Sequence, residues 1–351
     1  MEDGMTTTAL RFYLQSEARR ILPEHRVGQC LRAVVPNHRL VEVWKDTNRG
    51  KAHYRHLRTC GSIWVCPICA SKISEHRKRE IRRVINALVD QPVLCLFTLS
   101  HSKKTPLRVT VAELLAAYAG FTSGKGWQDI RTRFDIFGWV RSLEFTHGDN
   151  GWHPHLHVIM WAKAKNYDCM RDAMGARWGK ILNTIGKRYV EGISFNLKEA
   201  DRDVGDYVAK MGVQNVNWDI EHEVAKSVIK KAKPGHRNPI QLLYDSAHGD
   251  KQATKLFKEY AEFTAGKRQL EWSRSPNLKM IAGVLDIEDG DIMEIHEESA
   301  YLMASLTIEQ WHKVLRVGGV GDLLDMAEHS NIMEFYVWLK DICGYVPIHE
   351  L

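Results

Sequence analysis

The sequence lacks long apolar runs and targeting patterns. Its 351 residues contain no stretch of about 18 consecutive apolar residues that could span a bilayer, and the N-terminus does not show the pattern of a secretory signal. It also contains no internal repeat and no low-complexity segment. With 44% apolar and 26% charged residues, these absences indicate a globular protein of two or three domains with no membrane partner.

Cysteine is scarce and odd in number, with seven residues, which indicates a reducing compartment in a chain without an export signal. Three of the seven are Cys60, Cys66 and Cys69. The C-P-x-C segment 66–69 is a tight turn that can bring two thiolates to one metal ion. A redox pair is the alternative, but the cysteine six residues upstream favours a tetrahedral zinc site. The candidates for the fourth ligand are Cys30, His53 and His56.

Charge is divided unevenly along the chain. Residues 286–351 contain 14 acidic and three basic residues, a net charge of −11. Because the whole chain carries +6, residues 1–285 carry +17. A basic excess of this size suits a polyanion such as nucleic acid. The segment 71–85 predicts a helix with one strongly basic face, which could lie against a phosphate backbone or be solvated.

The middle of the chain alternates between strand and helix patterns. We expect strands at 93–100, 137–146, 152–161 and 189–197, and helices at 111–119, 172–185 and 203–211. Gly148-Asp149-Asn150-Gly151 predicts a hairpin between the second and third strands. This order is that of an α+β fold with a ferredoxin-like antiparallel sheet, helices on one face and a site on the other. After a charged linker at 230–239, the remainder, including 242–260 and 306–340, is expected to be mostly helical.

Histidines occupy alternate positions of the strand 152–161. Residues i and i+2 of a strand project from the same face, so His153, His155 and His157 are predicted to share one small volume as a metal or phosphate site. Imidazole is the commonest side-chain metal ligand, and Glu144 on the paired strand can reach the same face. A carboxylate beside two imidazoles completes a site for Mg²⁺ or Mn²⁺, and Mn²⁺ tolerates nitrogen ligands better.

A tyrosine lies on the predicted helix 203–211. Asp203, Tyr207 and Lys210 share one face because they are spaced i, i+4 and i+7. A nearby ammonium and a metal-bound phosphate favour the ionised form of a phenol, so Tyr207 could attack phosphorus. The alternative is that Tyr207 packs in the core.

These residues resemble the motifs of a known family. The strand 96–100, the segment 153–157 and the Tyr207-x-x-Lys210 helix are similar, in order and spacing, to the three motifs of the replication initiators (Rep proteins) of small rolling-circle plasmids, which are HUH endonucleases. The cysteine segment and residues 266–274 also resemble parts of these initiators. The resemblance covers residues 27 to 280.

The resemblance implies a bacterial, cytoplasmic enzyme that nicks one DNA strand at the plasmid's double-strand origin. Tyr207 would keep the 5′ phosphate as a phosphotyrosyl ester and leave a free 3′ hydroxyl. His155, His157 and Glu144 would hold the metal that polarises the scissile phosphate. Lys210 would assist by its charge.

The family pattern also assigns an acid, and the sequence departs from that pattern at one position. Asp203 would activate water or the end of the new strand for the terminating cleavage, and Asp206 and Glu199 are alternatives for this role. Met211 stands where close relatives often carry another tyrosine. A mechanism with two tyrosines is therefore disfavoured.

The expected organisation has four parts: a zinc-knuckle region with a basic helix at 1–90, an endonuclease core at 91–215, a basic linker and helices at 216–285, and an acidic helical region at 286–351. The acidic region could dock a host helicase or self-associate. Three other functions stay open. A histidine-triad nucleotide hydrolase shares the His-x-His-x-His pattern, a zinc-containing DNA-binding protein shares the charge and the cysteines, and a transposase or relaxase shares the chemistry.

Overall fold

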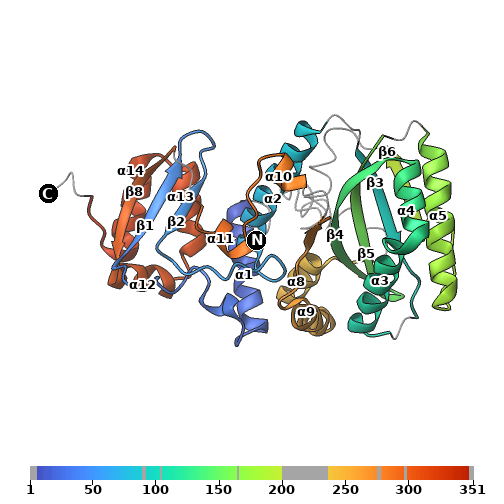
Figure 1. Cartoon of the computed structure of the whole chain (residues 1–351). Coiled ribbons are helices and arrows are strands. Elements are labelled where there is room, and N and C mark those ends of the chain that lie inside the picture. Colours follow the sequence, from blue (N-terminus) through green and yellow to red (C-terminus); the bar gives the residue numbers. More distant parts are fainter. Residues whose placement is uncertain are drawn as a thin grey trace.

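A computed structural model describes residues 6–88, 92–102, 105–163, 166–199, 236–274, 278–295 and 299–347. Two antiparallel sheets organise this part of the chain, one of five strands and one of three. They lie at opposite ends of the molecule, with helices α1 (Thr7–Ile21) and α2 (Pro67–Ala87) between them (Figure 1). The prediction of an α+β fold with antiparallel sheets is confirmed.

The five-stranded sheet has the order β6-β3-β5-β4-β7. Its strands are β3 (Pro92–Thr98), β4 (Ile136–Gly148), β5 (Gly151–Ala162), β6 (Phe195–Glu199) and β7 (Leu270–Trp272). All neighbours are antiparallel, and Gly148 pairs with Gly151 at the tip of the expected hairpin. The first four strands and their helices follow the ferredoxin-like order. The sequence pattern did not predict β7, which adds a strand beside β4.

Three helices cover one face of this sheet (Figure 1). They are α3 (Leu107–Phe121), α4 (Gly124–Arg133) and α5 (Tyr167–Thr184). The Phe97 ring of β3 lies at the centre of this layer, with its centroid 4.9 Å from that of Phe121 and 5.2 Å from that of Trp178. Alternate side chains of β5 point into the same layer, and Leu156 and Val158 are fully buried there. This apolar layer fixes the strands that carry the histidines.

The fourth strand of the ferredoxin-like unit begins later than expected. The pattern predicted a strand over 189–197, whereas β6 starts at Phe195. Gly192 has a left-handed φ of +71°, and the carbonyl of Val190 accepts hydrogen bonds from the amides of Ile193 and Ser194. This turn uses the backbone groups that a strand would need.

The other face of the sheet is covered at one end by α2. Ile81, Val84 and Ile85 of this helix form a cluster with Ile159 and Trp161 of β5. Ile159 and Trp161 continue the alternation of the histidines along β5, so they lie on the histidine face. The histidines therefore lie further along the same face, beyond this apolar cluster.

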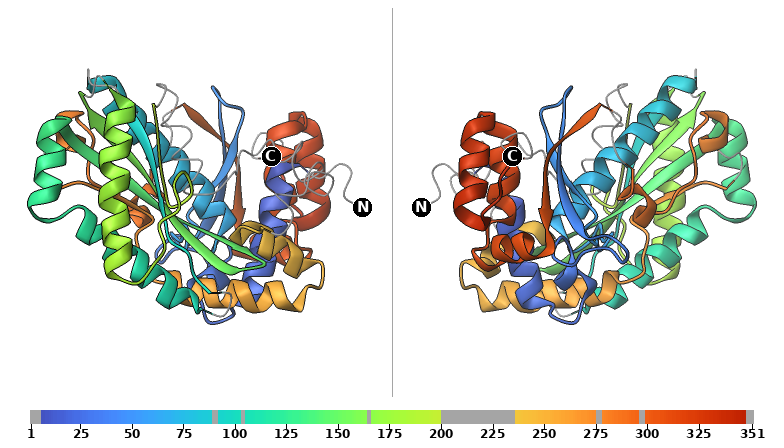
Figure 2. Two further views of the ribbon diagram at one scale, coloured as in Figure 1. Left: turned by 90° about the vertical axis from the view of Figure 1, so that its right-hand side faces the viewer. Right: turned by 90° about the vertical axis from the view of Figure 1, so that its left-hand side faces the viewer.

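The three-stranded sheet joins the two ends of the chain. It consists of β1 (Leu40–Asp46), β2 (Ala52–Arg55) and β8 (Ala300–Thr307), in the order β2-β1-β8. The region 286–351 was expected to be helical, and β8 is the exception. The helices of this region pack beside α1 and the three-stranded sheet (Figure 2). They are α12 (Ile308–Arg316), α13 (Val320–His329) and α14 (Ile332–Cys343).

The remaining elements connect the two sheets. They are η1 (Arg26–Gln29), α8 (Pro239–Ala247), α9 (Lys251–Thr264), α10 (Leu278–Ile281) and α11 (Asp289–Ile292). Glu259 of α9 accepts hydrogen bonds from the Trp152 indole (2.9 Å) and the Leu107 amide (3.0 Å), which ties α9 to β5 and α3. Within the described ranges, no helix has both the length and the apolar character needed to cross a bilayer.

Candidate metal centres and catalytic face

Glu144, His155 and His157 meet on the face of the sheet opposite α3 and α5. Glu144 pairs directly with His155 across β4 and β5. The Glu144 Oε2 atom lies 3.3 Å from Nε2 of His155 and 3.4 Å from Nε2 of His157, and one potential ligand atom from each residue lies within 4.8 Å of the others. Glu144 and His157 are buried, whereas His155 is partly exposed. The group could hold one metal ion, as the alternation of the strand predicted.

The hydrogen bonds of His155 support this interpretation. Its Nδ1 atom lies 3.0 Å from the His153 carbonyl, which can only accept, so Nδ1 is the donor. In the neutral ring, Nε2 then presents a lone pair toward the Glu144 carboxylate. Two lone pairs at this distance repel each other unless a proton or a cation lies between them. The donor set therefore fits a divalent cation.

Two opposing effects act on the Glu144 carboxyl. Burial raises its pKa, but the imidazoles of His157 and His155 lower it more, so the pKa lies below its ordinary value. The carboxylate is consequently ionised at neutral pH and available as a metal ligand.

The third histidine of the strand lies apart from this group. His153 shares the face of His155 and His157, but its ring faces His236, with centroids 5.7 Å apart. Burial lowers the pKa of His153, as do the neighbouring imidazoles of His236 and His155. The prediction that all three imidazoles share one volume therefore holds for two of them.

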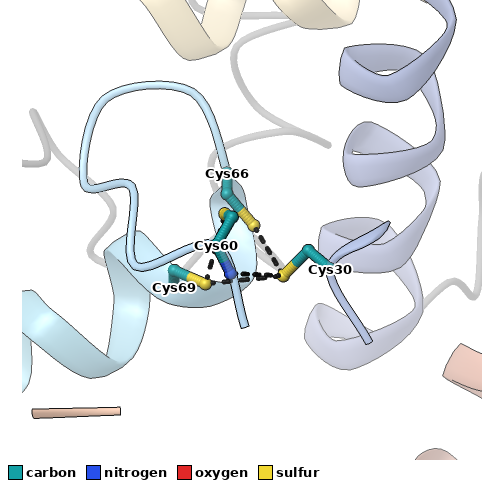
Figure 3. Close-up of side chains that lie close together, drawn as sticks. All are labelled: Cys30, Cys60, Cys66 and Cys69. Atoms are coloured by element: carbon teal, nitrogen blue, oxygen red, sulfur yellow. Dashed lines mark hydrogen bonds between the residues drawn. The ribbon is translucent and has the colours of Figure 1, made fainter. Parts of the chain in front are cut away.

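Four buried cysteines form the second candidate metal centre (Figure 3). Cys30 Sγ lies 3.8 Å from Cys66 Sγ and 3.6 Å from Cys69 Sγ, and Cys60 Sγ lies 3.6 Å from Cys69 Sγ. Cys66 is the N-cap of α2 and Cys69 lies in its first turn. Of the three candidates for the fourth position, the structure selects Cys30, which follows η1. His56 instead stacks on His38, with ring centroids 3.9 Å apart.

All four thiols of this centre can be ionised at the same time only if they bind a cation. Burial opposes ionisation of Cys66, but hydrogen bonds from Cys30, Cys60 and Cys69 lower its pKa well below the ordinary value. The pKa of Cys60 is raised, chiefly by its hydrogen bonds with Cys30 and Cys66. An ionised Cys66 thus opposes ionisation of the buried Cys60 beside it, whereas four thiolate ligands require a metal. Gln15 Nε2 also donates to Cys66 Sγ at 3.2 Å.

The predicted nucleophile lies outside the described residues. Tyr207, Lys210, Asp203, Asp206 and Met211 all fall within the segment 200–235, so their roles stay predictions. Glu199, an alternative for the acid, is described. It pairs with Val93 and interacts with Tyr167 on the helix-covered face, so it is on the wrong side of the sheet for the metal group.

Two features of the histidine face were not predicted from the sequence. Ser142 pairs with His157, is fully buried, and its Oγ has no hydrogen-bond partner in the described part of the chain. Trp272 of β7 pairs with Val140, which also lies on this face. Counting back from Glu144 by twos would have found Ser142, but no local pattern indicates that β7 joins this sheet.

Comparisons with known proteins find similarity to replication proteins. A family model described as "Replication protein" matches residues 51–187. "Protein rep" of Streptomyces lividans is 24% identical over 343 residues, which cover 77% of this chain and 75% of that protein. The chain is similar to Rep replication proteins. The resemblance to replication initiators that the motifs predicted is thereby confirmed.

Other relatives match a smaller part of the chain. "Protein rep" of Bacillus amyloliquefaciens is 25% identical over 142 residues, 39% of each chain. A "Neomycin resistance protein" of Streptomyces cyanogenus is 27% identical over 146 residues, 34% of this chain and 33% of that protein. No solved structure matches the chain. The Rep family match contains Glu144, His155, His157 and three of the four cysteines, whereas Cys30 and β7 lie outside it.

Proposed function

We propose that this Rep relative initiates rolling-circle replication of a plasmid by nicking and rejoining one DNA strand. The observation that carries the proposal is the Glu144, His155 and His157 group on the face of a ferredoxin-like sheet. A carboxylate and two imidazoles directed at one point suit a cation that binds a scissile phosphate. Mg²⁺ or Mn²⁺ is the proposed catalytic ion, and Zn²⁺ is proposed for the four cysteines.

The proposed reaction is a transesterification. The Tyr207 oxygen attacks phosphorus, the bond to the 3′ oxygen breaks, and the phenol proton is transferred to that oxygen to give a 3′ hydroxyl. The strand remains joined to Tyr207 through its 5′ phosphate, so rejoining needs no external energy source. Lys210 would stabilise the charge on the phosphate, and Asp203 would accept a proton in the terminating cleavage. A bound metal ion would supply further charge stabilisation.

The proposed substrate is origin DNA that is single-stranded at the nick. Basic residues on α2 support contact with phosphates, because Arg82 and Arg83 are exposed on this helix. The proposed location is the bacterial cytoplasm, where a host helicase could bind the acidic region 286–351.

The hydrolase alternative fits the histidines less well. In a histidine-triad hydrolase the middle imidazole would attack phosphorus, which requires its Nε2 to face the substrate. Here Nε2 of both His155 and His157 faces Glu144. This favours metal binding over nucleophilic attack by an imidazole.

The decisive experiment uses supercoiled DNA that carries the plasmid's own origin, with Mn²⁺. We expect a nicked product with the protein linked to its 5′ end. Tyr207→Phe should abolish the adduct because it removes the nucleophilic oxygen, whereas Tyr13→Phe, at an exposed tyrosine of α1, should not. An adduct that persists in Tyr207→Phe would contradict the assignment of the nucleophile.

A second variant tests the metal group. Glu144→Gln keeps the shape of the side chain but removes its charge. We expect Mn²⁺ affinity to fall by about tenfold or more, since loss of even an outer-shell partner costs about 10–100-fold, and nicking to fall with it. Calorimetric titration with Mn²⁺ measures the first effect, and Glu334→Gln on the exposed surface of α14 is the control. Unchanged Mn²⁺ binding in Glu144→Gln would contradict the site.

A further inference from the structure

The cavity beside β7 has no role in the chemistry described above. It has a volume of about 530 Å³, within the range of about 300–1,000 Å³ that is typical of small-ligand sites. One wall is β7 with its flanking residues, and the other is the segment 286–289. Arg77 of α2 and Lys279 of α10 also line it. The strand belongs to the segment 266–274, which resembles part of the replication initiators but has no function assigned above.

The sheet register places this cavity close to the metal group. Leu270 pairs with Ser142, and Ser142 pairs with His157. The side chains of Leu270 and Trp272 therefore lie on the histidine face. Since adjacent strands are about 4.8 Å apart, the backbone of Leu270 is about 10 Å from that of His157. The cavity is therefore within reach of a DNA strand that is bound at the metal group.

Within the described residues, the outward backbone groups of the strand beside the cavity make no hydrogen bond. The amide of Ser273 and the carbonyl of Gln269 bond to β4, at 2.8 Å and 3.0 Å. Because successive residues of a strand alternate in direction, the backbone groups of Leu270 and Trp272 point away from β4. In the part of the chain that the structure describes, β7 is an edge strand. The buried Nε1 atom of Trp272 also has no hydrogen-bond partner among the described residues.

The charges around the cavity are balanced. Four basic and four acidic side chains line it, and they form ion pairs: Arg77 with Asp289 at 2.7 Å, Arg268 with Glu288 at 2.6 Å, and Lys279 with Asp286 at 3.0 Å. A phosphate would meet these carboxylates. An uncharged ring with donors and acceptors on its edge fits the lining better.

We propose that this cavity receives one unstacked nucleobase of the DNA strand that is nicked. The base lies against the Trp272 indole, and its polar edge bonds to the outward backbone groups of β7. Recognition of single strands commonly combines an aromatic side chain with hydrogen bonds to an unpaired base. The proposal rests on the proposed function in taking a DNA strand as the substrate, and it adds a position where that strand is held.

The test is photo-crosslinking of a single-stranded thymidine 12-mer with one 5-iodouracil, bound to the full chain. We expect a cross-link to a peptide that contains Trp272, and weaker cross-linking of the same strand in a duplex. A cross-link that maps only to peptides outside the cavity overturns the proposal. This measurement uses the unaltered protein, so it does not depend on whether a variant folds.

Substitutions extend the test. Trp272→Ala should weaken binding of the 12-mer by about tenfold, the order expected from loss of one aromatic contact to a base, and Trp272→Phe should retain most of the affinity. Trp338→Ala, in α14 of the other sheet region, is the matched control. Binding of Trp272→Ala equal to that of the unaltered chain, with an unchanged Tm, counts against the proposal.

A metal-site variant separates this inference from the catalytic proposal. The double variant His155→Ala, His157→Ala should lose nicking but still cross-link through Trp272. If nicking fails in every form while the Trp272 cross-link persists, the cavity proposal stands and the catalytic proposal fails.

Discussion

At the residue scale, His101 is a buried imidazole that makes folding sensitive to acid. Its side chain is 1% exposed and lies 3.3 Å from Glu113. Its pKa is lowered from 6.5 to about 4, chiefly by burial; the charge of Lys187 and the His153 imidazole also lower it, and Glu113 raises it. The folded state therefore binds this proton less readily than the unfolded state. Its contribution to stability is complete above pH 6.5 and is lost as the pH falls from 6.5 toward 4.

We predict that His101→Gln reduces the loss of stability between pH 7 and pH 5. Urea unfolding at the two pH values gives the free energy of unfolding, and the difference between them should shrink in the variant. His329→Gln is the control, because His329 is 54% exposed. An equal pH dependence in His101→Gln and in the unaltered protein would show that His101 does not carry the effect.

At the element scale, the cysteine centre ties η1, the loop after β2 and the start of α2 together. Cys30→Ser should remove one ligand, release the zinc that we propose, and lower the Tm by about 5 °C or more, since structural zinc sites contribute directly to folding. Metal content by atomic emission and thermal unfolding measure the two effects. Cys169→Ser, at a partly exposed cysteine of α5, should leave both unchanged. Full metal content in Cys30→Ser would contradict the four-cysteine site.

The contact between α1 and α13 depends on a glycine. A Cβ at Gly321 would lie 2.9 Å from the Phe12 Cβ atom, which cannot move without its helix. Gly321→Ala should therefore destabilise the protein by about 1–3 kcal/mol despite a better helix propensity. Gly120 of α3 has open space at the same position, so Gly120→Ala should be neutral or stabilise by up to about 1 kcal/mol. Denaturant unfolding of the two variants compares them, and equal stabilities would contradict the close contact.

At the scale of the whole molecule, the acidic C-terminal region is part of the fold of the N-terminal region. Leu40 of β1 pairs with Thr307 of β8. Glu328 accepts hydrogen bonds from the Ala52 amide at 3.1 Å and from Lys51 Nζ at 2.9 Å. The hydroxyl of Tyr54 donates to the carbonyl of Val320, 266 positions away.

We therefore predict that a chain truncated after Leu285 loses cooperative unfolding of its N-terminal region and aggregates, because β1 becomes an exposed edge and Tyr54 loses its partner. Light scattering and thermal unfolding measure this outcome. Loss of nicking in this truncated chain would thus reflect misfolding. Helicase docking is better tested with Glu309→Gln and Glu334→Gln, at two exposed carboxylates. A soluble truncated chain with a sharp unfolding transition would contradict this account.

Periodicity along the chain was sufficient to predict the ferredoxin-like order of strands, the hairpin and the pairing of Glu144 with the histidine strand. These features depend on neighbours in sequence, because alternation and turn residues fix which face a side chain occupies. The same alternation could not predict that His153 lies apart, since that depends on its packing beside His236. The start of β6 was also missed, because a turn at Gly192 replaced the first residues of the expected strand.

The sequence alone was enough to predict that two imidazoles and a carboxylate share one face of a hairpin, and that the C-P-x-C turn can bring two thiols to a metal site. The folded structure was needed to show that Cys30 is the fourth sulfur of the cluster, that β7 extends the five-stranded sheet and that β8 pairs with β1. Each of these contacts joins segments distant in the chain. Such contacts leave no local periodicity, because their free energy comes from burial and hydrogen bonds that exist only after the chain has folded.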